Sequence, residues 1–407
     1  MEVVAVYFPS WHPDAHYERW YGPGFSEWRL LEQARPLFEG HEQPRQCAWG
    51  AFDESAPAWM ERQIALAADH GITCFLFDWY WYGGTQFLHR ALEDGFLKAR
   101  NRHRLKFFVM WANHTWGVWP AAREAFRGHT GGATRHEGQA LAYDKPLLEI
   151  RHSPDDLTAV VRHCEANYFA EPNYLRLDGR PVFAFWNWQP LQDQLGDDAE
   201  IARGLAAMRA ASPDGLHLMM NVANYENAET VHCWWPGLIP RLKAVGIDSI
   251  YGYNAARTAA FPALTDAWPV VPYTDVITTH RQLFALCGNR GLPFHPVATV
   301  GFDNTPRWHR GATLPVDFRR LHYEPIVTGS TPERFGQLVG LCRESIERAG
   351  GGNRMLLINA WNEWTEGCCL LPDPRHGTAF LTALRGALDG VPARGKPAPD
   401  GPRGAAT

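Results

Sequence analysis

Short apolar runs recur along the chain, and polar stretches with helical spacing separate most of them. The runs are rich in Val, Ile, Phe and Leu, which predicts strands buried on both faces. Eight such runs are Val3–Phe8, Ile72–Phe77, Leu105–Trp111, Pro181–Trp186, Leu216–Val222, Ser249–Tyr253, Pro296–Val300 and Met355–Ala360. Apolar positions repeated every three or four residues predict helices at Ala56–His70, Phe87–Arg102, Asp155–Phe169, Glu200–Ala211, Ile277–Arg290, Pro332–Ala349 and, more weakly, Pro236–Val245. Ser153 and Thr331 each precede a proline, which is typical of a helix N-terminus.

The alternation of strands and helices predicts parallel βαβ units, and eight of them predict a closed (β/α)8 TIM barrel in a single domain of residues 1–390. A doubly wound open sheet is the alternative, but it usually has fewer strands, and the chain shows no glycine-rich phosphate fingerprint. Three long insertions follow strands 1, 3 and 7: Ser10–Ser55, Asn113–Ser153 and Gly301–Ser330. Such loops lie at the C-terminal face of a barrel, where its active site lies. The Pro-, Gly- and Ala-rich tail, 391–407, is expected to be disordered.

Composition narrows the classes of function. Of 407 residues, 45% are hydrophobic and 20% are charged, which excludes extended disorder for most of the chain. The net charge of −5 gives no basic footprint for nucleic acid. The apolar runs are too short to span a membrane, and the first residues do not resemble a secretory signal, so we expect a cytoplasmic protein. The 8 cysteines are scattered without a CxxC pair, as expected of reduced thiols.

Aromatic residues are unusually frequent, with 18 Trp, 13 Tyr and 21 Phe. Many stand beside Asn, Asp or Glu at predicted strand ends, as in the segments 79–82, 111–116 and 361–364. Aromatic faces stack on the C–H faces of sugar rings, while neighbouring amides and carboxylates bind sugar hydroxyls. A Trp-rich core explains some of these residues, but it poorly explains the polar neighbours, which are costly to bury unpaired. The pattern favours a glycan-binding site.

The segment Asn359–Gly367, NAWNEWTEG, carries the most specific chemical signal. It leaves the last predicted strand and places Glu363 and Glu366 three residues apart. Glycosidic bonds are commonly cleaved by two carboxyl groups, one acting as acid and the other as nucleophile or base. Trp364 between them could exclude water and raise one pKa, and Asn362 could bind a sugar hydroxyl or orient Glu363. The simpler alternative is a structural turn with solvated glutamates.

Other strand ends add candidates for substrate binding. Asp78 either binds a sugar hydroxyl or lies beneath the site and pairs with an arginine. Asp303 and Arg307 are four residues apart, and a local pair in a structural loop explains them equally well. The predicted substrate-binding residues are Tyr7, Trp11, His12, Trp28, Asp78, Trp79, Tyr80, Trp81, Trp111, Asn113, His114, Trp116, Tyr253, Asp303, Arg307, Trp361, Asn362 and Trp364. The sequence has no GxSxG, HExxH or P-loop motif, and we expect neither a catalytic metal nor another cofactor.

Several of these motifs, taken in order, resemble a known family. YFPSWHP, WYGPGFSEWRLLEQARPLFEGHEQPR, FDWYWYGG, WANHTW, GFDNTPR and NAWNEWTEG are similar to segments of WbsX-type proteins, bacterial proteins with a domain like that of family 99 glycoside hydrolases. The resemblance covers about Val3 to Leu371. It implies a (β/α)8 barrel with the activity of a retaining endo-α-mannosidase that needs no metal. It assigns Glu363 as the base that deprotonates the sugar 2-hydroxyl, giving a 1,2-anhydro intermediate, and Glu366 as the acid/base.

The chain departs from the family after the third strand, where His114 replaces an acidic residue and Gly117-Val118 stand near a usual Arg. The sugar bound there is therefore expected to differ. Our leading hypothesis is a retaining α-glycoside hydrolase acting on a bacterial polysaccharide or oligosaccharide. The alternative is a WbsX-type glycosyltransferase in O-antigen or polysaccharide biosynthesis, although no DxD-type motif is present. A third hypothesis, a non-catalytic glycan-binding barrel, does not require both glutamates.

Overall fold

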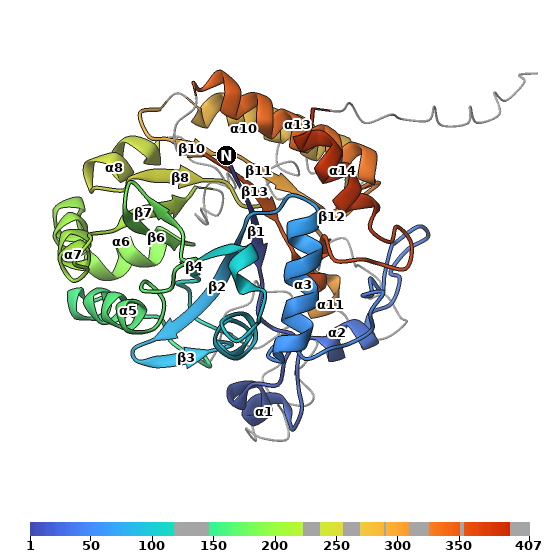
Figure 1. The fold of residues 1–407 in the computed structure, drawn as a ribbon, viewed down its shortest axis with the longest axis horizontal. Helices are drawn as coiled ribbons and strands as arrows, with labels where there is room; N and C mark the ends of the chain where they lie inside the picture. The colour runs from blue at the N-terminus through green and yellow to red at the C-terminus, as the bar shows by residue number, and fades with distance from the viewer. Residues whose placement is uncertain are drawn as a thin grey trace, which may run out of the picture.

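A barrel of parallel strands forms the centre of the molecule, with helices arranged around it (Figure 1). The computed structural model describes residues 1–117, 146–222, 237–254, 269–288, 290–308, 325–350 and 354–390. The insertions predicted at Asn113–Ser153 and Gly301–Ser330 lie partly outside these ranges, and the tail 391–407 lies wholly outside them. The barrel strands are β1 (Glu2–Tyr7), β2 (Cys74–Tyr82), β4 (Lys106–Trp111), β6 (Arg180–Phe185), β7 (His217–Asn221), β8 (Ser249–Tyr251), β10 (Phe294–His295), β11 (Val297–Thr299) and β13 (Met355–Asn359).

The barrel closes at Pro296, which separates β10 from β11. The strand order is β10-β8-β7-β6-β4-β2-β1-β13-β11, so β10 pairs with β8 and β11 pairs with β13. Proline has no N–H to donate, but the Pro296 carbonyl accepts a 2.9 Å bond from the Leu357 N–H. The two short strands are thus halves of one strand that joins both edges of the sheet. The predicted (β/α)8 barrel is confirmed, although its seventh strand begins at Phe294 rather than at Pro296.

The helices around the barrel largely follow the predicted amphipathic segments. Ser153 forms a capping box with Asp156, and the Thr331 hydroxyl accepts from the Arg334 N–H, as their positions before prolines indicated. The predicted helices are α3 (Pro57–Asp69), α5 (Pro154–Asn167), α7 (Asp198–Ala210), α8 (Leu238–Ala244), α10 (Tyr273–Cys287) and α13 (Pro332–Arg348). Elements not predicted are α1 (Ala15–Tyr21), α2 (Trp28–Gln33), α6 (Gln189–Leu195), α11 (Thr305–Trp308), α14 (Ala379–Leu388), β3 (Thr85–Phe87), β5 (Arg176–Leu177), β9 (Val270–Pro272), β12 (Ile326–Thr328), β14 (Asn362–Glu363), β15 (Cys368–Cys369) and the 3-10 turn η4 (Trp364–Glu366).

The helix predicted at Phe87–Arg102 is present only in part and is not an α-helix. The chain instead forms a π-helix, η1 (Ala91–Phe96), and a 3-10 turn, η2 (Arg102–Arg104). Gly95 packs so closely against the backbone that a Cβ there would lie 2.3 Å from the Glu54 carbonyl oxygen. This contact requires glycine on the helix face that meets the first insertion.

Alternation along β2 separates the side chains that enter the barrel from those that face the helices. Phe75 and Phe77 pack on Phe96 of η1, with ring centroids 6.2 and 5.4 Å away, so they face outward. Because successive side chains of a strand point to opposite faces, Asp78 and Tyr80 face the barrel interior. The described cysteines are free thiols, and no helix in the described ranges has the length and apolarity to cross a membrane.

Candidate active site

Glu363 and Glu366 stand where the chain turns back after the last barrel strand. β13 ends at Asn359, β14 pairs antiparallel with β15, and η4 joins these two short strands. Gly367 ends η4 with φ of +65°, and a Cβ there would lie 3.1 Å from the Asp303 backbone nitrogen. The Asp303 N–H also donates a 2.7 Å bond to the Glu366 carbonyl. The turn that carries both glutamates is therefore fixed against the loop after β11.

Arg307 of α11 brings the two carboxyl groups to one point. Its Nη1 lies 2.5 Å from Glu366 Oε1, and its Nη2 lies 3.5 Å from Glu363 Oε1. Its Nε donates a 3.1 Å bond to Glu27 Oε2 on the far side of the guanidinium. The guanidinium carbon lies 5.0 Å from the centre of the Phe8 ring, which limits its freedom to move. One cation thus contacts three carboxylates in the described part of the site.

The two glutamates differ in their environments. The Glu363 residue is only 4% exposed, and burial, followed by repulsion from Glu366, raises its pKa well above the usual range despite the charge of Arg307. The Tyr253 hydroxyl donates a 3.3 Å bond to Glu363 Oε2. The Glu366 side chain is more open, with 19% of its surface exposed. The pair therefore offers one buried carboxyl group and one that solvent reaches.

Asp78 adds a third carboxyl group facing the barrel interior. Burial and the nearby charge of Glu366 raise its pKa well above the usual range, against the opposing effect of Arg307. Within the described residues, its buried Oδ1 has no hydrogen-bond partner. An unpaired buried oxygen is costly, so this atom is suited to accept a bond from a ligand.

Tyr80 lies on the same face of β2 as Asp78 and contacts two of the residues predicted after β4, His114 and Trp116. Its ring centre lies 5.2 Å from that of Trp116 and 6.2 Å from that of His114. His114 also lies 5.1 Å from the Trp186 ring. The residue that replaces the family's acidic group is thus surrounded by aromatic rings.

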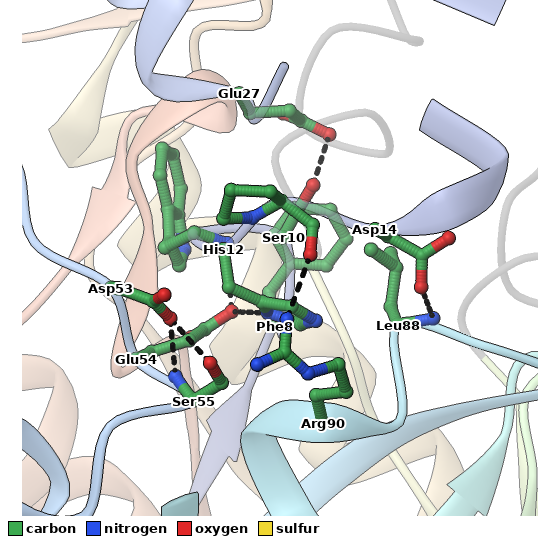
Figure 2. A network of polar contacts seen from close by, with 12 residues as sticks. Phe8, Ser10, His12, Asp14, Glu27, Asp53, Glu54, Ser55, Leu88 and Arg90 are labelled. Atoms are coloured by element: carbon green, nitrogen blue, oxygen red, sulfur yellow. Dashed lines mark hydrogen bonds and ion pairs between the residues drawn. The ribbon is translucent and has the colours of Figure 1, made fainter. Parts of the chain in front are cut away.

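Glu27 is part of the site, and the sequence analysis did not single it out. Its carboxylate accepts hydrogen bonds from Ser10 Oγ at 3.1 Å, from the Tyr17 hydroxyl at 3.3 Å and from the Thr365 hydroxyl. Figure 2 shows the contact between Glu27 and Ser10. The sequence offered one signal for Glu27: it stands between Ser26 and Trp28, inside one of the motifs that carry the family resemblance. The carboxylate lies behind Arg307 and supports it.

Asp303 joins the first insertion to the loop after β11. Its Oδ2 accepts bonds from His41 Nε2 at 2.8 Å and from Gln43 Nε2 at 2.7 Å. Burial alone would raise the pKa of Asp303, but hydrogen bonds from His41 and Thr305, together with the charge of Arg45, outweigh it and hold the pKa below the usual range. Asp303 was predicted to bind substrate or to pair with Arg307, and the structure gives it these partners in the first insertion.

A second buried network lies on the outer side of β1 (Figure 2). Glu54 accepts a 2.8 Å bond from the Tyr7 hydroxyl and a 2.7 Å bond from the Trp11 N–H, and it lies 3.0 Å from His12 Nδ1. Gln63 of α3 contacts the Tyr7 hydroxyl. These partners place Tyr7 and His12 in a network that anchors the first insertion.

Several other predicted residues face the helices or hold the backbone. Trp79 and Trp81 stack 5.5 Å apart and both lie against His163 of α5. Trp111 packs on His152, Trp11 packs on Trp28, and Trp364 is buried. Two tryptophans donate hydrogen bonds: Trp361 to the Gln63 side chain and Trp28 to the Phe52 carbonyl. Two asparagines hold the backbone: Asn113 bonds to Asn187, and Asn362 bonds to both backbone groups of Phe8. The predicted residues gathered around the two glutamates are Asp78, Tyr80, Tyr253 and Arg307.

The described residues contain no group of three or more His, Cys, Asp and Glu arranged to hold a metal ion.

Comparison with known sequences gives a family match over almost the whole chain. A family model described as "Glycosyltransferase WbsX" matches residues 3–384. Two proteins called uncharacterized protein WxcX, from two strains of Xanthomonas campestris pv. campestris, are each 29% identical to this chain over 397 residues. The match covers 96% of this chain and 50% of each relative, so the chain spans about half the length of these curated relatives.

Solved structures share the fold. The GH99 endo-alpha-mannosidase from Bacteroides thetaiotaomicron, in complex with bis-tris-propane, aligns with a TM-score of 0.57 over 96% of both chains at 13% identity. A glycoside hydrolase-like protein aligns with a TM-score of 0.54 at 14% identity, over 95% of this chain and 93% of that one. At these identities, the likeness establishes the barrel fold.

Proposed function

Because the chain belongs to the family described as glycosyltransferase WbsX, we propose that its barrel acts on glycans, and specifically as a retaining α-glycoside hydrolase. The proposed reaction is like that of an endo-α-mannosidase, on a bacterial polysaccharide or oligosaccharide. The solved family 99 enzyme with the same fold supports this choice of reaction.

The observation that carries the proposal is the convergence of Glu363 and Glu366 on the guanidinium of Arg307. Glycoside hydrolysis needs two carboxyl groups near one bond, with one proton available between them. Burial and mutual repulsion make it costly for both groups to be charged, so the pair is suited to hold one proton. A structural turn with solvated glutamates does not require this buried arrangement.

The charge of the site favours a sugar without acidic groups. Arg307 already contacts Glu27, Glu363 and Glu366, and Asp78 adds a further carboxyl group. Hydroxyl groups of a neutral sugar can donate to these oxygens, whereas a carboxylate or phosphate on the sugar would be repelled. We therefore propose a neutral sugar in the subsite that contains Asp78.

The family resemblance gives Glu363 the role of base and Glu366 that of acid/base. The raised pKa of Glu363 makes it a strong base once it loses its proton, but it also favours the protonated form before reaction. With the proton on Glu363, the two roles would be exchanged. The glutamine variants below decide between these assignments.

Turnover of α-mannosyl fluoride and other α-glycosyl fluorides, without nucleotide or added metal, tests the proposal. Fluoride leaves without acid assistance, so a variant of the acid keeps part of its activity, while a variant of the base loses it. Loss in Glu363→Gln, by about 10²-fold or more, with partial activity in Glu366→Gln supports the roles implied by the resemblance. The opposite pattern assigns the acid to Glu363, and full activity in either variant contradicts the proposal.

Glu32→Gln is a matched control, because Glu32 lies on α2, is exposed and undergoes the same change of charge. The anomeric form of the first product, read by NMR, tests retention. Glycosyl transfer is the second candidate, and the family description favours it. Turnover that requires a nucleotide sugar and a divalent ion, with no release from any fluoride, would support transfer instead.

A further inference from the structure

Glu27 lies at the start of α2, fully buried between three parts of the chain. Ser10 and Tyr17 contact it from the first insertion, Thr365 from the turn between the reacting glutamates, and Arg307 from α11. A buried carboxylate is stable only when charged or polar partners satisfy its oxygens, and these four do so. The N-cap position does not account for it, since Glu27 makes no side-chain cap bond to α2.

The contacts of Arg307 show what Glu27 contributes. Nε and Nη2 of Arg307 lie 3.1 and 3.5 Å from the two Glu27 oxygens, so the carboxylate holds one edge of the planar guanidinium. Glu27 holds that edge, and the guanidinium carbon lies over the Phe8 ring. In this position, Nη1 faces Glu366 and Nη2 faces Glu363. Loss of the Glu27 contact would free the guanidinium to move toward either carboxylate.

We propose that Glu27 is a positioning residue that holds Arg307 between Glu363 and Glu366 and adds its own negative charge to the surroundings of that pair. The inference rests on the proposed function, in which the pair reacts. The charge of Glu27 is one of the causes that raise the pKa of Glu363. The ionisable groups that interact with the pair from each neighbouring element are Glu27 at α2, Asp78 and Tyr80 of β2, Tyr253 after β8, Arg307 of α11 and Cys368 of β15.

Replacing Glu27 by glutamine keeps the size of the side chain and removes its charge. The site then carries one negative charge fewer, so Glu363 loses its proton more readily. The titration midpoint of Glu363 is therefore expected to fall, because repulsion from Glu27 is one of the causes that raise its pKa. The pH profile of fluoride turnover is expected to shift by a similar amount in the same direction.

A titration that does not depend on activity tests this inference. Protein labelled with ¹³C at the glutamate carboxyl groups is titrated by NMR, and the Glu363 signal is assigned by its absence in Glu363→Gln. We expect the Glu363 midpoint to fall in Glu27→Gln and to stay unchanged in Glu32→Gln. An unchanged midpoint in folded Glu27→Gln would overturn the inference, since a purely structural role predicts lower stability without a shift.

A second variant covers the case in which Glu27→Gln does not fold. Glu27→Asp keeps the charge but withdraws the carboxylate from Arg307 by one methylene, so a smaller downward shift is expected, and no shift would again refute the inference. The NMR result is independent of the proposed reaction. If wild type releases no fluoride and its turnover requires a nucleotide sugar and a divalent ion, the hydrolase proposal fails, while the titration still decides the role of Glu27.

Discussion

Replacing Asp303 by asparagine tests how the first insertion is held over the barrel. Asp303 is 1% exposed, and its two oxygens accept bonds from His41, Gln43 and both the N–H and hydroxyl of Thr305. The Leu37 N–H donates to His41 Nδ1, so the proton on Nε2 points at Asp303. Asparagine has the same shape, but its NH₂ group must face either His41 and Gln43 or Thr305, where the hydroxyl can turn to accept a bond and the N–H cannot.

The expected cost follows from the donor left without an acceptor. The better orientation leaves one buried donor, the Thr305 N–H, without a partner, and such a donor costs about 1–3 kcal/mol, so Asp303→Asn is expected to lower the free energy of unfolding by about 2 kcal/mol at pH 7. The pKa of Asp303 is held below its usual value in the folded state, so its contribution is complete above the unfolded pKa and is lost as pH falls below it. The difference from wild type should therefore shrink by about 1 kcal/mol between pH 7 and pH 3.

Urea unfolding at several pH values, read by tryptophan fluorescence, measures both effects. Asp53→Asn is the control, because Asp53 accepts from the N–H and hydroxyl of Ser55 as Asp303 does from Thr305, but it is exposed. We expect the control to change stability by less than about 0.5 kcal/mol. Equal stability of Asp303→Asn and wild type at pH 7, or a difference that does not change with pH, would refute the reasoning.

Four other substitutions test separate parts of the structure. Asn362→Ala removes two hydrogen bonds to the backbone at the end of β1 and should lower the free energy of unfolding by about 2–4 kcal/mol in urea titrations. Gly95→Ala should lower the melting temperature because its Cβ would meet the Glu54 carbonyl. Gly340→Ala on α13 has open space around the new Cβ, so it should raise the free energy of unfolding by about 0.5–1 kcal/mol. Glu363→Gln should raise the melting temperature above pH 5, and the gain should grow with pH. The reason is that the pKa of Glu363 is raised in the folded state, so wild type loses stability as this proton dissociates. A gain that does not depend on pH would contradict this cause.

The barrel was predictable because parallel strands buried on both faces appear as continuous apolar runs. The start of the seventh strand was missed because Phe294 precedes Pro296, and proline usually marks a break. The helices α1 and α2 were missed because they lie inside an insertion where tertiary contacts, rather than a long apolar period, determine the structure.

The position of Glu363 and Glu366 at the end of the last strand was also predictable, whereas their partners were not. A buried glutamate such as Glu27 has no local signature, since the arginine that neutralises it is 280 residues away in the sequence. The alternation of side chains along β2 would have predicted that Trp79 and Trp81 lie on the opposite face from Asp78 and Tyr80. Their contacts with His163 of α5 place them on that outer face.

The distance in sequence between Glu27 and Arg307 has a consequence for synthesis of the protein. A ribosome adds about 5–20 residues per second, so about 15–55 s pass between the appearance of the carboxylate and that of the guanidinium 280 residues later. During that interval, the first insertion has its own network around Glu54, but neither Arg307 for Glu27 nor Asp303 for His41. The end of the barrel that carries Glu363 and Glu366 is therefore completed late, and an interrupted chain that ends before α11 lacks the partners that Glu27 and His41 bind in the complete barrel.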